Sequence, residues 1–254
     1  MKTPTVPKTD YSKIASYYDR VKLAPTAELL SRIIEYGRID SSSTVLDVGC
    51  GTGRFTLKMS AAKPFVLLAL EPSIEMLRQA VVKDQSKSVL WVRGDGQRLP
   101  FREGFFDCVY MTSVIHHIED KKMALQQIYS VLKDRGNCVI MTYSHSGIRK
   151  NIINCFPGVT ATDSKRMPSV PELKNLMRTV GFKDVSYHVV KRDEGYTPTD
   201  EYLERVRNKY VSTLTLFDED TFQRGLKIFE RRVRQKYGDQ IKKVSWFVIV
   251  SGQK

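Results

Sequence analysis

The sequence has no long hydrophobic run and few cysteines. No apolar stretch approaches the ~20 residues that cross a bilayer, and residues 1–13 lack the apolar segment of a signal peptide. We therefore expect a cytoplasmic protein without a membrane span. The four cysteines form no C-x-x-C pair, and three of them, Cys50, Cys108 and Cys138, lie in or beside expected strands, which favours buried free thiols.

Acidic residues are scarce relative to basic ones. Lys and Arg together number 41 against 28 for Asp and Glu, so the formal net charge is +13. This charge makes a nucleic acid, an acidic substrate or an anionic surface a candidate partner without deciding among them. A length of 254 residues with a hydrophobic fraction of 41% suits one large α/β domain, or a domain with an inserted cap.

The stretch 44–71 has the pattern of a nucleotide-binding βαβ unit. A short apolar strand pattern ends at Asp47, and a segment that can be helical, 55–62, leads to a second apolar run that ends at Glu71. Glycine has no Cβ, so a ligand can lie against bare backbone in the turn between strand and helix. The free N–H groups at a helix N-terminus favour negative charge, and an acid that closes the second strand can accept from both hydroxyls of a ribose. The turn contains three glycines at alternate positions: Gly49, Gly51 and Gly53.

The spacing of these glycines differs from that of the dinucleotide fingerprint G-x-G-x-x-G, because the third glycine comes one residue early. The run VLDVGCGTG resembles motif I of the class I S-adenosylmethionine (SAM)-dependent methyltransferases. The later text TSVIHHIED is similar to their small-molecule and quinone-type members, the methyltransferase type 11 or UbiE-like group. The resemblance covers about 11–190 and the final strand.

The resemblance implies an α/β, Rossmann-like fold. It predicts a seven-stranded sheet in the order 3-2-1-4-5-7-6, with the last strand antiparallel, helices on both faces, and here a helical cap insertion. Ser73 and Asp120 are expected helix N-caps. The sixth and seventh strands are expected at 185–190 and 244–250, and the helix after Asp120 is expected to stop at Gly136.

Two stretches interrupt the alternation of strands and helices. Residues 144–168 are expected to form an inserted lid segment, since long loops in compact domains are usually functional or disordered. Residues 192–243 are expected to form a helical cap, whose second helix has an apolar stripe and an opposite basic face that solvation alone would explain. The expected domains are therefore 1–143 (N-terminal helices and SAM-binding core), 144–168 (lid), 169–191 (core continued), 192–243 (cap) and 244–254 (final core strand).

The resemblance also implies roles for particular residues. Glu71 would hold the ribose, Asp95 would accept from the adenine amine, and the backbone N–H of Gly96 would reach a ring nitrogen. Read without the resemblance, Asp95 is an ordinary turn residue, and the aromatics of Tyr17-Tyr18-Asp19 could simply pack on the sheet instead of folding over the methyl donor. The expected cofactor-binding residues are Tyr18, Asp47, Gly49, Cys50, Gly51, Gly53, Glu71, Pro72, Asp95, Gly96, Thr112 and Ser113.

The pair His116-His117 follows the fourth expected strand. Adjacent residues on a strand or helix do not face the same way, and no further ligand pattern stands nearby, so we expect no metal site. His116 or His117 could face the acceptor, and His116 is the candidate catalytic base. The alternative is that it forms part of the pocket wall.

The expected reaction is in-line transfer of the SAM methyl group to an O, N, C or S atom, leaving S-adenosylhomocysteine. Placement and exclusion of water suffice for much of such a reaction. The sequence has no [DN]-P-P-[YFW] after the fourth strand and no Pro-Cys nucleophile, both of which mark base-modifying enzymes. A small-molecule acceptor is therefore favoured. The alternatives are a tRNA or rRNA methyltransferase that uses the basic cap, and a non-catalytic SAM-binding protein; the acceptor atom and the oligomeric state stay open.

Overall fold

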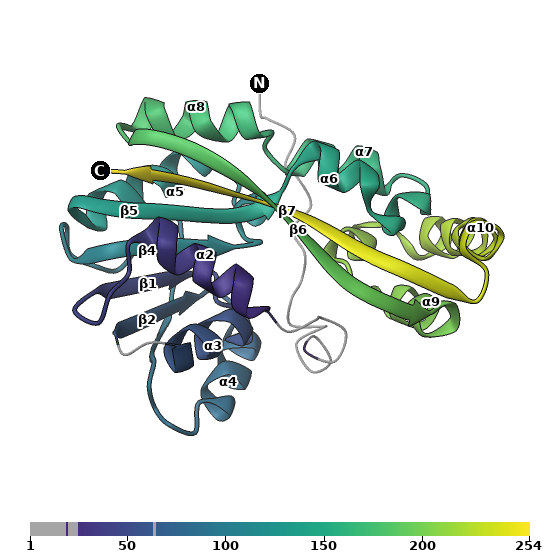
Figure 1. The fold of residues 1–254 in the computed structure, drawn as a ribbon, viewed down its shortest axis with the longest axis horizontal. Helices are drawn as coiled ribbons and strands as arrows, with labels where there is room; N and C mark the ends of the chain where they lie inside the picture. Colours follow the sequence, from purple (N-terminus) through teal and green to yellow (C-terminus); the bar gives the residue numbers. More distant parts are fainter. Residues whose placement is uncertain (1–18, 20–24, 63–64) are drawn as a thin grey trace. The chain divides into compact units, whose positions relative to one another are not determined.

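The fold is built on one seven-stranded sheet with the order β3-β2-β1-β4-β5-β7-β6 (Figure 1), which confirms the expected topology. The computed structural model describes residues 19, 25–62 and 65–254. Strands β1 to β5 pair in parallel, whereas β7 runs opposite to β5. The strands are β1 Thr44–Val48, β2 Val66–Glu71, β3 Leu90–Arg93, β4 Phe106–Thr112, β5 Leu132–Tyr143, β6 Lys183–Pro198 and β7 Gln240–Gln253.

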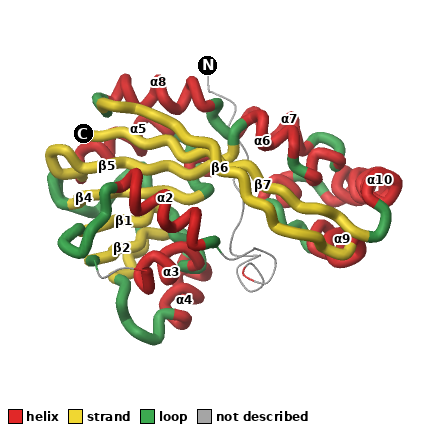
Figure 2. The backbone as a smooth tube through the Cα atoms, viewed as in Figure 1, coloured by secondary structure: helices red, strands yellow, loops and turns green. Residues whose placement is uncertain are grey.

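Helices cover both faces of the sheet, as the handedness of parallel crossovers requires (Figure 2). The chain moves outward from β1 to β2 to β3 through α3 and α4, and it moves the other way from β4 to β5 through α5, so α5 lies on the opposite face. Helix α2 contacts α3 and β4, and α8 packs against α5. These helices are α2 Ala27–Gly37, α3 Arg54–Ala62, α4 Ile74–Lys83, α5 Lys121–Val131 and α8 Val170–Val180.

Hydrogen-bonded N-caps begin three of these helices. The side chains of Thr26, Ser73 and Asp120 accept from the backbone N–H groups of Leu29, Met76 and Met123. Each cap pairs one of the donors that a helix leaves unpaired in its first turn. The caps predicted at Ser73 and Asp120 are therefore confirmed.

The chain divides into two compact units. The core unit holds the described residues up to Thr142 together with Val170–His188 and Val248–Lys254. The second unit holds Tyr143–Ser169 and Val189–Phe247, so the boundary between the units falls within β5, β6 and β7. The core unit buries β1 and most of β2 almost completely, because a parallel sheet is covered on both faces.

The second unit has a hydrophobic core of its own. Phe156 is buried and lies 5.7–5.8 Å, ring centroid to ring centroid, from Phe217, Phe222 and Phe229. The apolar stripe expected on the long helix, which includes Phe222 and Phe229, is buried here. The helices are α6 His145–Lys150, η3 Ile152–Cys155, α7 Val159–Arg166, α9 Thr199–Arg207, η4 Ser212–Leu216 and α10 Glu219–Tyr237.

Three features differ from the sequence-based expectation. The stretch 144–168 is mostly helical, because Ile152, Ile153 and Phe156 bury themselves in the second unit's core. Helix α5 ends at Val131 instead of Gly136, since β5 already pairs with Phe106 of β4 at Leu132. Strands β6 and β7 extend well beyond 185–190 and 244–250.

No helix in the described part of the chain combines the length and the hydrophobicity that a membrane crossing requires.

Candidate active site

The loops that follow β1, β2, β3 and β4 meet at the carboxyl edge of the sheet. The N–H of Gly49, after β1, donates to the carbonyl of Leu70 in β2 over 2.7 Å, and the N–H of Gly94, after β3, donates to the carbonyl of Glu71 over 3.2 Å. After β4, Ser113 donates to the carbonyl of Met141 in β5 over 2.8 Å. The candidate residues between Asp47 and Ser113 therefore lie in neighbouring loops of the core unit.

The three glycines of the turn hold left-handed backbone conformations, with φ of +77° at Gly49, +57° at Gly51 and +76° at Gly53. A Cβ on Gly49 would lie 2.5 Å from a methyl group of Val114, and one on Gly53 would lie 2.8 Å from the Trp91 ring. A Cβ on Gly51 would meet no described heavy atom within 4 Å. Gly49 and Gly53 are thus required by packing, whereas no described residue fills the space beside the backbone of Gly51.

Glu71 closes the glycine turn. One of its carboxylate oxygens accepts from the N–H of Gly51 over 2.9 Å, and the other accepts from the N–H of Ser73 over 3.0 Å. Burial raises the pKa of this carboxyl, and the two backbone N–H groups oppose the rise by favouring the charged form. Each oxygen keeps a second lone pair that could accept from a ligand hydroxyl.

Asp47 lies beneath the turn and is fully buried. Its Oδ2 accepts from the hydroxyls of Thr56, over 2.7 Å, and Tyr110, over 2.9 Å. Its Oδ1 makes no hydrogen bond with any described residue. Burial raises the pKa of Asp47 from 3.8 to about 7 although the two hydroxyls lower it, and the negative charge of Glu71 adds to the rise.

Cys50 helps to form the glycine turn through its backbone and not through its thiol. Its N–H donates to the carbonyl of Leu70 over 3.1 Å. Burial, with the nearby charges of Asp47 and Glu71, raises the pKa of the Cys50 thiol well above its ordinary value, so the thiol stays protonated and unreactive. Cys108 and Cys138 are also buried free thiols, as expected.

Asp95 and Gly96 form a tight turn after β3. The Asp95 carboxylate is exposed and accepts from the N–H of Gln97 over 2.9 Å. A Cβ on Gly96 would lie 3.0 Å from a methyl group of Val48, so this turn packs against the end of β1. Pro72 is exposed directly after Glu71. The structure thus brings the Asp95 turn beside the glycine turn.

Thr112 ends β4, and Ser113 follows in a left-handed conformation with φ of +59°. Such a conformation is uncommon outside glycine and often marks a constrained site. His116 lies in the short 3-10 helix η2, Ile115–His117, where it is buried with its ring centroid 4.0 Å from that of His117. Among the described residues, no cluster of His, Cys, Asp and Glu could hold a metal ion.

Several contacts at the site were not predicted from the sequence. The carboxylate of Asp19 accepts from the Thr52 hydroxyl of the glycine turn over 2.5 Å and also pairs with Lys83. The only signal for Thr56 and Tyr110 was a hydroxyl on an otherwise buried position, which needs a partner. Tyr18, which we expected to fold over the donor, lies outside the described residues.

Comparison with known proteins supports the family suggested by this geometry. The family model of the Methyltransferase domain matches residues 46–140. The Blochmanniella floridana ubiquinone/menaquinone biosynthesis C-methyltransferase UbiE is 27% identical over 181 residues, which cover 61% of this chain and 71% of that protein. Residues 46–140, which the family model matches, contain every candidate site residue except Tyr18.

Solved structures share the fold. One from Anabaena variabilis, provisionally named a methyltransferase of an antibiotic biosynthesis pathway, has a TM-score of 0.68 at 22% identity and covers 89% of this chain and 97% of its own. Haemonchus contortus phosphoethanolamine N-methyltransferase 2, solved with SAM, has a TM-score of 0.64 at 17% identity and covers 99% of this chain and 60% of its own. The domain match, the relative and the shared fold together support a class I SAM-dependent methyltransferase.

Proposed function

We propose that this enzyme transfers the methyl group of SAM to a small-molecule acceptor and leaves S-adenosylhomocysteine. The observation that carries the proposal is the convergence of the loops after β1 to β4 around Gly51. Its N–H is bound by Glu71, and no described residue fills the space beside it.

The residues present fit the proposed donor. The unpartnered Oδ1 of Asp47 suits the ammonium group of the donor's amino-acid end, because a buried carboxylate oxygen gains most from a charged donor. Glu71 offers lone pairs to the ribose hydroxyls, and the Asp95-Gly96 turn offers a carboxylate and an N–H to the adenine. Thr112 and Ser113 would lie near the methionine portion. Gly49, Cys50, Gly53 and Pro72 would contribute backbone.

The donor supplies a methyl group already activated by positive sulfur. The residues of the chain then have to bind the donor and the acceptor, orient them toward each other and exclude water. Orientation of this kind contributes on the order of 7–11 kcal/mol in model systems. His116 is the candidate base for an acceptor whose attacking atom carries a proton. Its burial in η2 beside His117 would shield that proton transfer from water.

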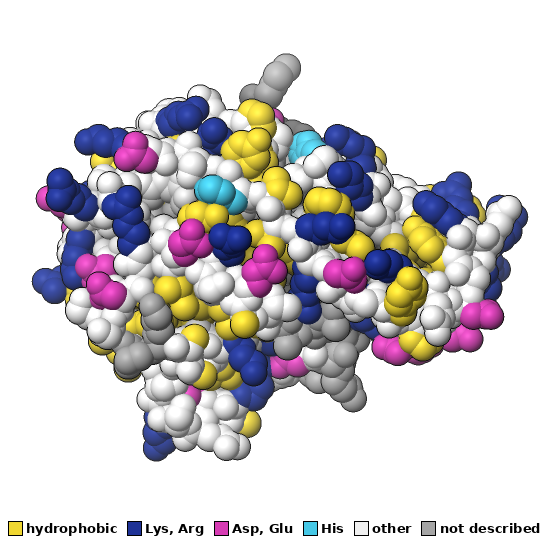
Figure 3. All heavy atoms as spheres, viewed as in Figure 1, with side chains coloured by type: hydrophobic (Ala, Val, Ile, Leu, Met, Phe, Trp, Pro, Cys, Tyr) yellow, Lys and Arg dark blue, Asp and Glu magenta, His cyan; other side chains and the backbone are white. Residues whose placement is uncertain are grey.

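Two observations favour a small-molecule acceptor. The relative from Blochmanniella floridana is named for ubiquinone and menaquinone biosynthesis, and its similarity covers 61% of this chain. Lys and Arg side chains are spread over the face seen in Figure 3, with acidic side chains among them, instead of forming one basic patch there. We assign acceptor selection to the second unit, the expected lid and cap, whose separate core lets its sequence vary without disturbing the glycine turn.

The donor site is tested with the variant Glu71→Ala, measured by calorimetric titration with SAM. Loss of a charged acceptor for two hydroxyls should weaken binding by roughly 10–100-fold. Glu71→Gln keeps one carbonyl oxygen and should lose less. Glu35→Ala, which removes an exposed acid of α2, is the matched control and should bind SAM normally. Unchanged affinity in correctly folded Glu71→Ala would contradict the assignment.

The acceptor class is tested by incubating the protein with methyl-labelled SAM and fractionated cell extract. We expect label in the metabolite fraction and none in RNA or protein. Label in RNA would instead identify the RNA methyltransferase alternative. Donor binding without transfer to any fraction would identify a non-catalytic SAM-binding protein.

A further inference from the structure

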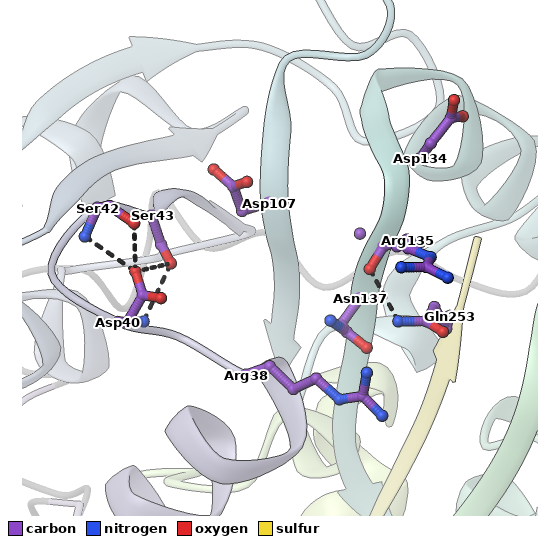
Figure 4. A pocket seen from close by; sticks show the side chains of 10 residues that line it. Arg38, Asp40, Ser42, Ser43, Asp107, Asp134, Arg135, Asn137 and Gln253 are labelled. Atoms are coloured by element: carbon purple, nitrogen blue, oxygen red, sulfur yellow. Dashed lines mark hydrogen bonds between the residues drawn. The ribbon is translucent and has the colours of Figure 1, made fainter.

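A cavity of about 510 Å³ lies at the amino end of the parallel strands. It is lined by Ser43, which precedes β1, by Asp107 at the start of β4, and by Asn137 of β5 (Figure 4). A five-residue strand spans four intervals of ~3.3 Å, which places the two ends of β1 about 13 Å apart. The cavity is therefore separate from the candidate active site, and its volume falls in the range of small-molecule sites.

The carboxylates of this cavity are largely engaged. Asp107 accepts from Lys133, whose Nζ lies 2.8 and 2.9 Å from its two oxygens, and from the N–H of Thr44 over 2.8 Å. Asp40 accepts from Ser42 and Ser43 on the same wall. Asp40 and Asp107 therefore have little capacity left for a cationic ligand, whereas the carboxylate of Asp134 lies at the far end in Figure 4 and points away from them.

The opposite wall offers donors that are not engaged. Arg38 and Arg135 form no ion pair with any residue that the structure describes. Figure 4 shows their guanidinium groups on the same side of the cavity as the amides of Asn137 and Gln253. Gln253 donates to the carbonyl of Arg135 over 2.9 Å, which fixes this wall.

Asn137 gives the second, independent observation. Only 8% of this residue is exposed, yet its side-chain amide makes no hydrogen bond within the described part of the chain. The amide is not among the fully buried polar atoms that lack a partner, so it is in contact with the solvent of the cavity. The amide lines the cavity, so a ligand there could supply that partner.

Both arginines also hold a conformation that suits glycine. Arg38 has φ of +50° at the C-terminal cap of α2, and Arg135 has φ of +64° within β5. Glycine is the usual residue at such a helix end, since it avoids the strain of a Cβ. Lys87 and Lys209 share this conformation outside the cavity, so it does not by itself mark a ligand site, but it makes glycine a mild substitution at both arginines.

We propose that this cavity binds a small molecule through a carboxylate or phosphate group held by Arg38, Arg135 and the amide of Asn137. Two guanidinium groups and an amide suit such an oxyanion, because charged donors form the strongest hydrogen bonds to it. The ligand would act as an effector and not as the methyl acceptor, since the cavity is at the edge of the sheet away from the glycine turn.

The test uses inorganic phosphate and succinate as separate probes, titrated at constant ionic strength while backbone amide NMR shifts are followed. We expect saturable binding with the largest shifts at residues 38, 135 and 137. Whichever probe binds more tightly identifies the anionic group. The absence of saturation with either probe, or shifts centred on 49–53, would overturn the proposal.

Glycine variants separate binding from folding. Arg38→Gly and Arg135→Gly should each bind the tighter probe at least tenfold more weakly, while the thermal midpoint stays the same or rises, because glycine adopts these conformations freely. Lys87→Gly is the matched control: it removes the same charge at φ of +51° outside the cavity and should bind normally. Equal affinity in all three variants would show that the arginines are not ligands.

Discussion

At the scale of the residue, Asp47 and Glu71 differ in their hydrogen bonds although both are buried acids beneath one turn. Glu71 receives two backbone N–H groups, so its charged form is compensated in the free protein. Asp47 receives two hydroxyls on one oxygen and none from described residues on the other. The free protein therefore favours a protonated Asp47, and a cationic ligand group would reverse that preference.

The first prediction concerns pH. The unfolded chain releases the Asp47 proton near pH 4, whereas the native protein holds it to about pH 7. The free energy of unfolding should therefore fall as pH rises through this window, by on the order of 4 kcal/mol in total. Asp47→Asn should lack this contribution, so its stability relative to the wild type should rise between pH 5 and 7.5.

Urea unfolding across that range measures the difference. Taking the variant minus the wild type cancels the contributions of the other titrating groups, provided they are unchanged. A constant difference across pH 5 to 7.5 would mean that Asp47 is ionised in the native protein throughout.

At the scale of the element, the glycine turn combines two requirements in one short segment. Gly49 and Gly53 let Val114 and Trp91 approach the backbone, which closes the turn against the loops of its neighbouring strands. Gly51 shares their left-handed conformation but not their close contacts. The packing role and the ligand role of the motif therefore fall on different glycines.

The second prediction separates these roles. Gly51→Ala and Gly104→Ala introduce a Cβ at φ of +57° and +60° respectively, and neither Cβ would meet a described atom within 4 Å. Both should destabilise the protein by about 1–2 kcal/mol, the strain of a left-handed alanine. Only Gly51→Ala should also lose SAM affinity. Thermal unfolding checks that the two variants are equally stable, and calorimetric titration with SAM then compares their affinities. Equal SAM affinity in both variants would contradict the prediction.

The third prediction concerns helix α10. A Cβ on Gly225 would lie 2.4 Å from the ring of Phe156, at the centre of the second unit's core. Alanine normally stabilises a helix relative to glycine by up to about 1 kcal/mol. Here the cost of overpacking against Phe156 should exceed the gain in helix propensity, so Gly225→Ala should destabilise the protein by about 1–3 kcal/mol.

Chemical unfolding compares this variant with Gln235→Ala, an exposed change on the same helix that should be nearly neutral. A Gly225→Ala variant as stable as the control would mean that Phe156 can move aside without loss.

At the scale of the whole molecule, the charge of +13 is a property of the surface more than of any site. Figure 3 shows both signs intermixed on the face it presents. Charge spread in this way attracts polyanions without reading their sequence, and salt weakens that attraction steeply.

The fourth prediction follows from that distribution. The protein should be retained on heparin at low ionic strength and should elute as salt rises, while RNA incubated with labelled SAM takes up no methyl group. Retention that persists above ~1 M salt would indicate a specific polyanion site, since the Debye length there is about 3 Å.

The sheet order was predicted by the resemblance to a known family, and the structure confirms it. The sequence by itself determined the position of the glycine turn and of the acids that follow or end the next two strands, because these depend on local pattern: apolar runs, glycine spacing and N-cap residues such as Ser73 and Asp120. Their functional roles remain proposals, but their placement in neighbouring loops follows from parallel strands that share one carboxyl edge.

Only the tertiary structure decided which groups face one another across the chain. The hydroxyls of Thr56 and Tyr110 reach Asp47 from positions 9 and 63 residues away in sequence. The helices of 144–168 form because Phe156 packs against Phe222 and Phe229 of α10, which are 66 and 73 residues onward in the sequence. The cavity at the amino edge joins three strands and a helix end. Burial and pairing of this kind depend on distances between segments, which no local pattern of residues contains.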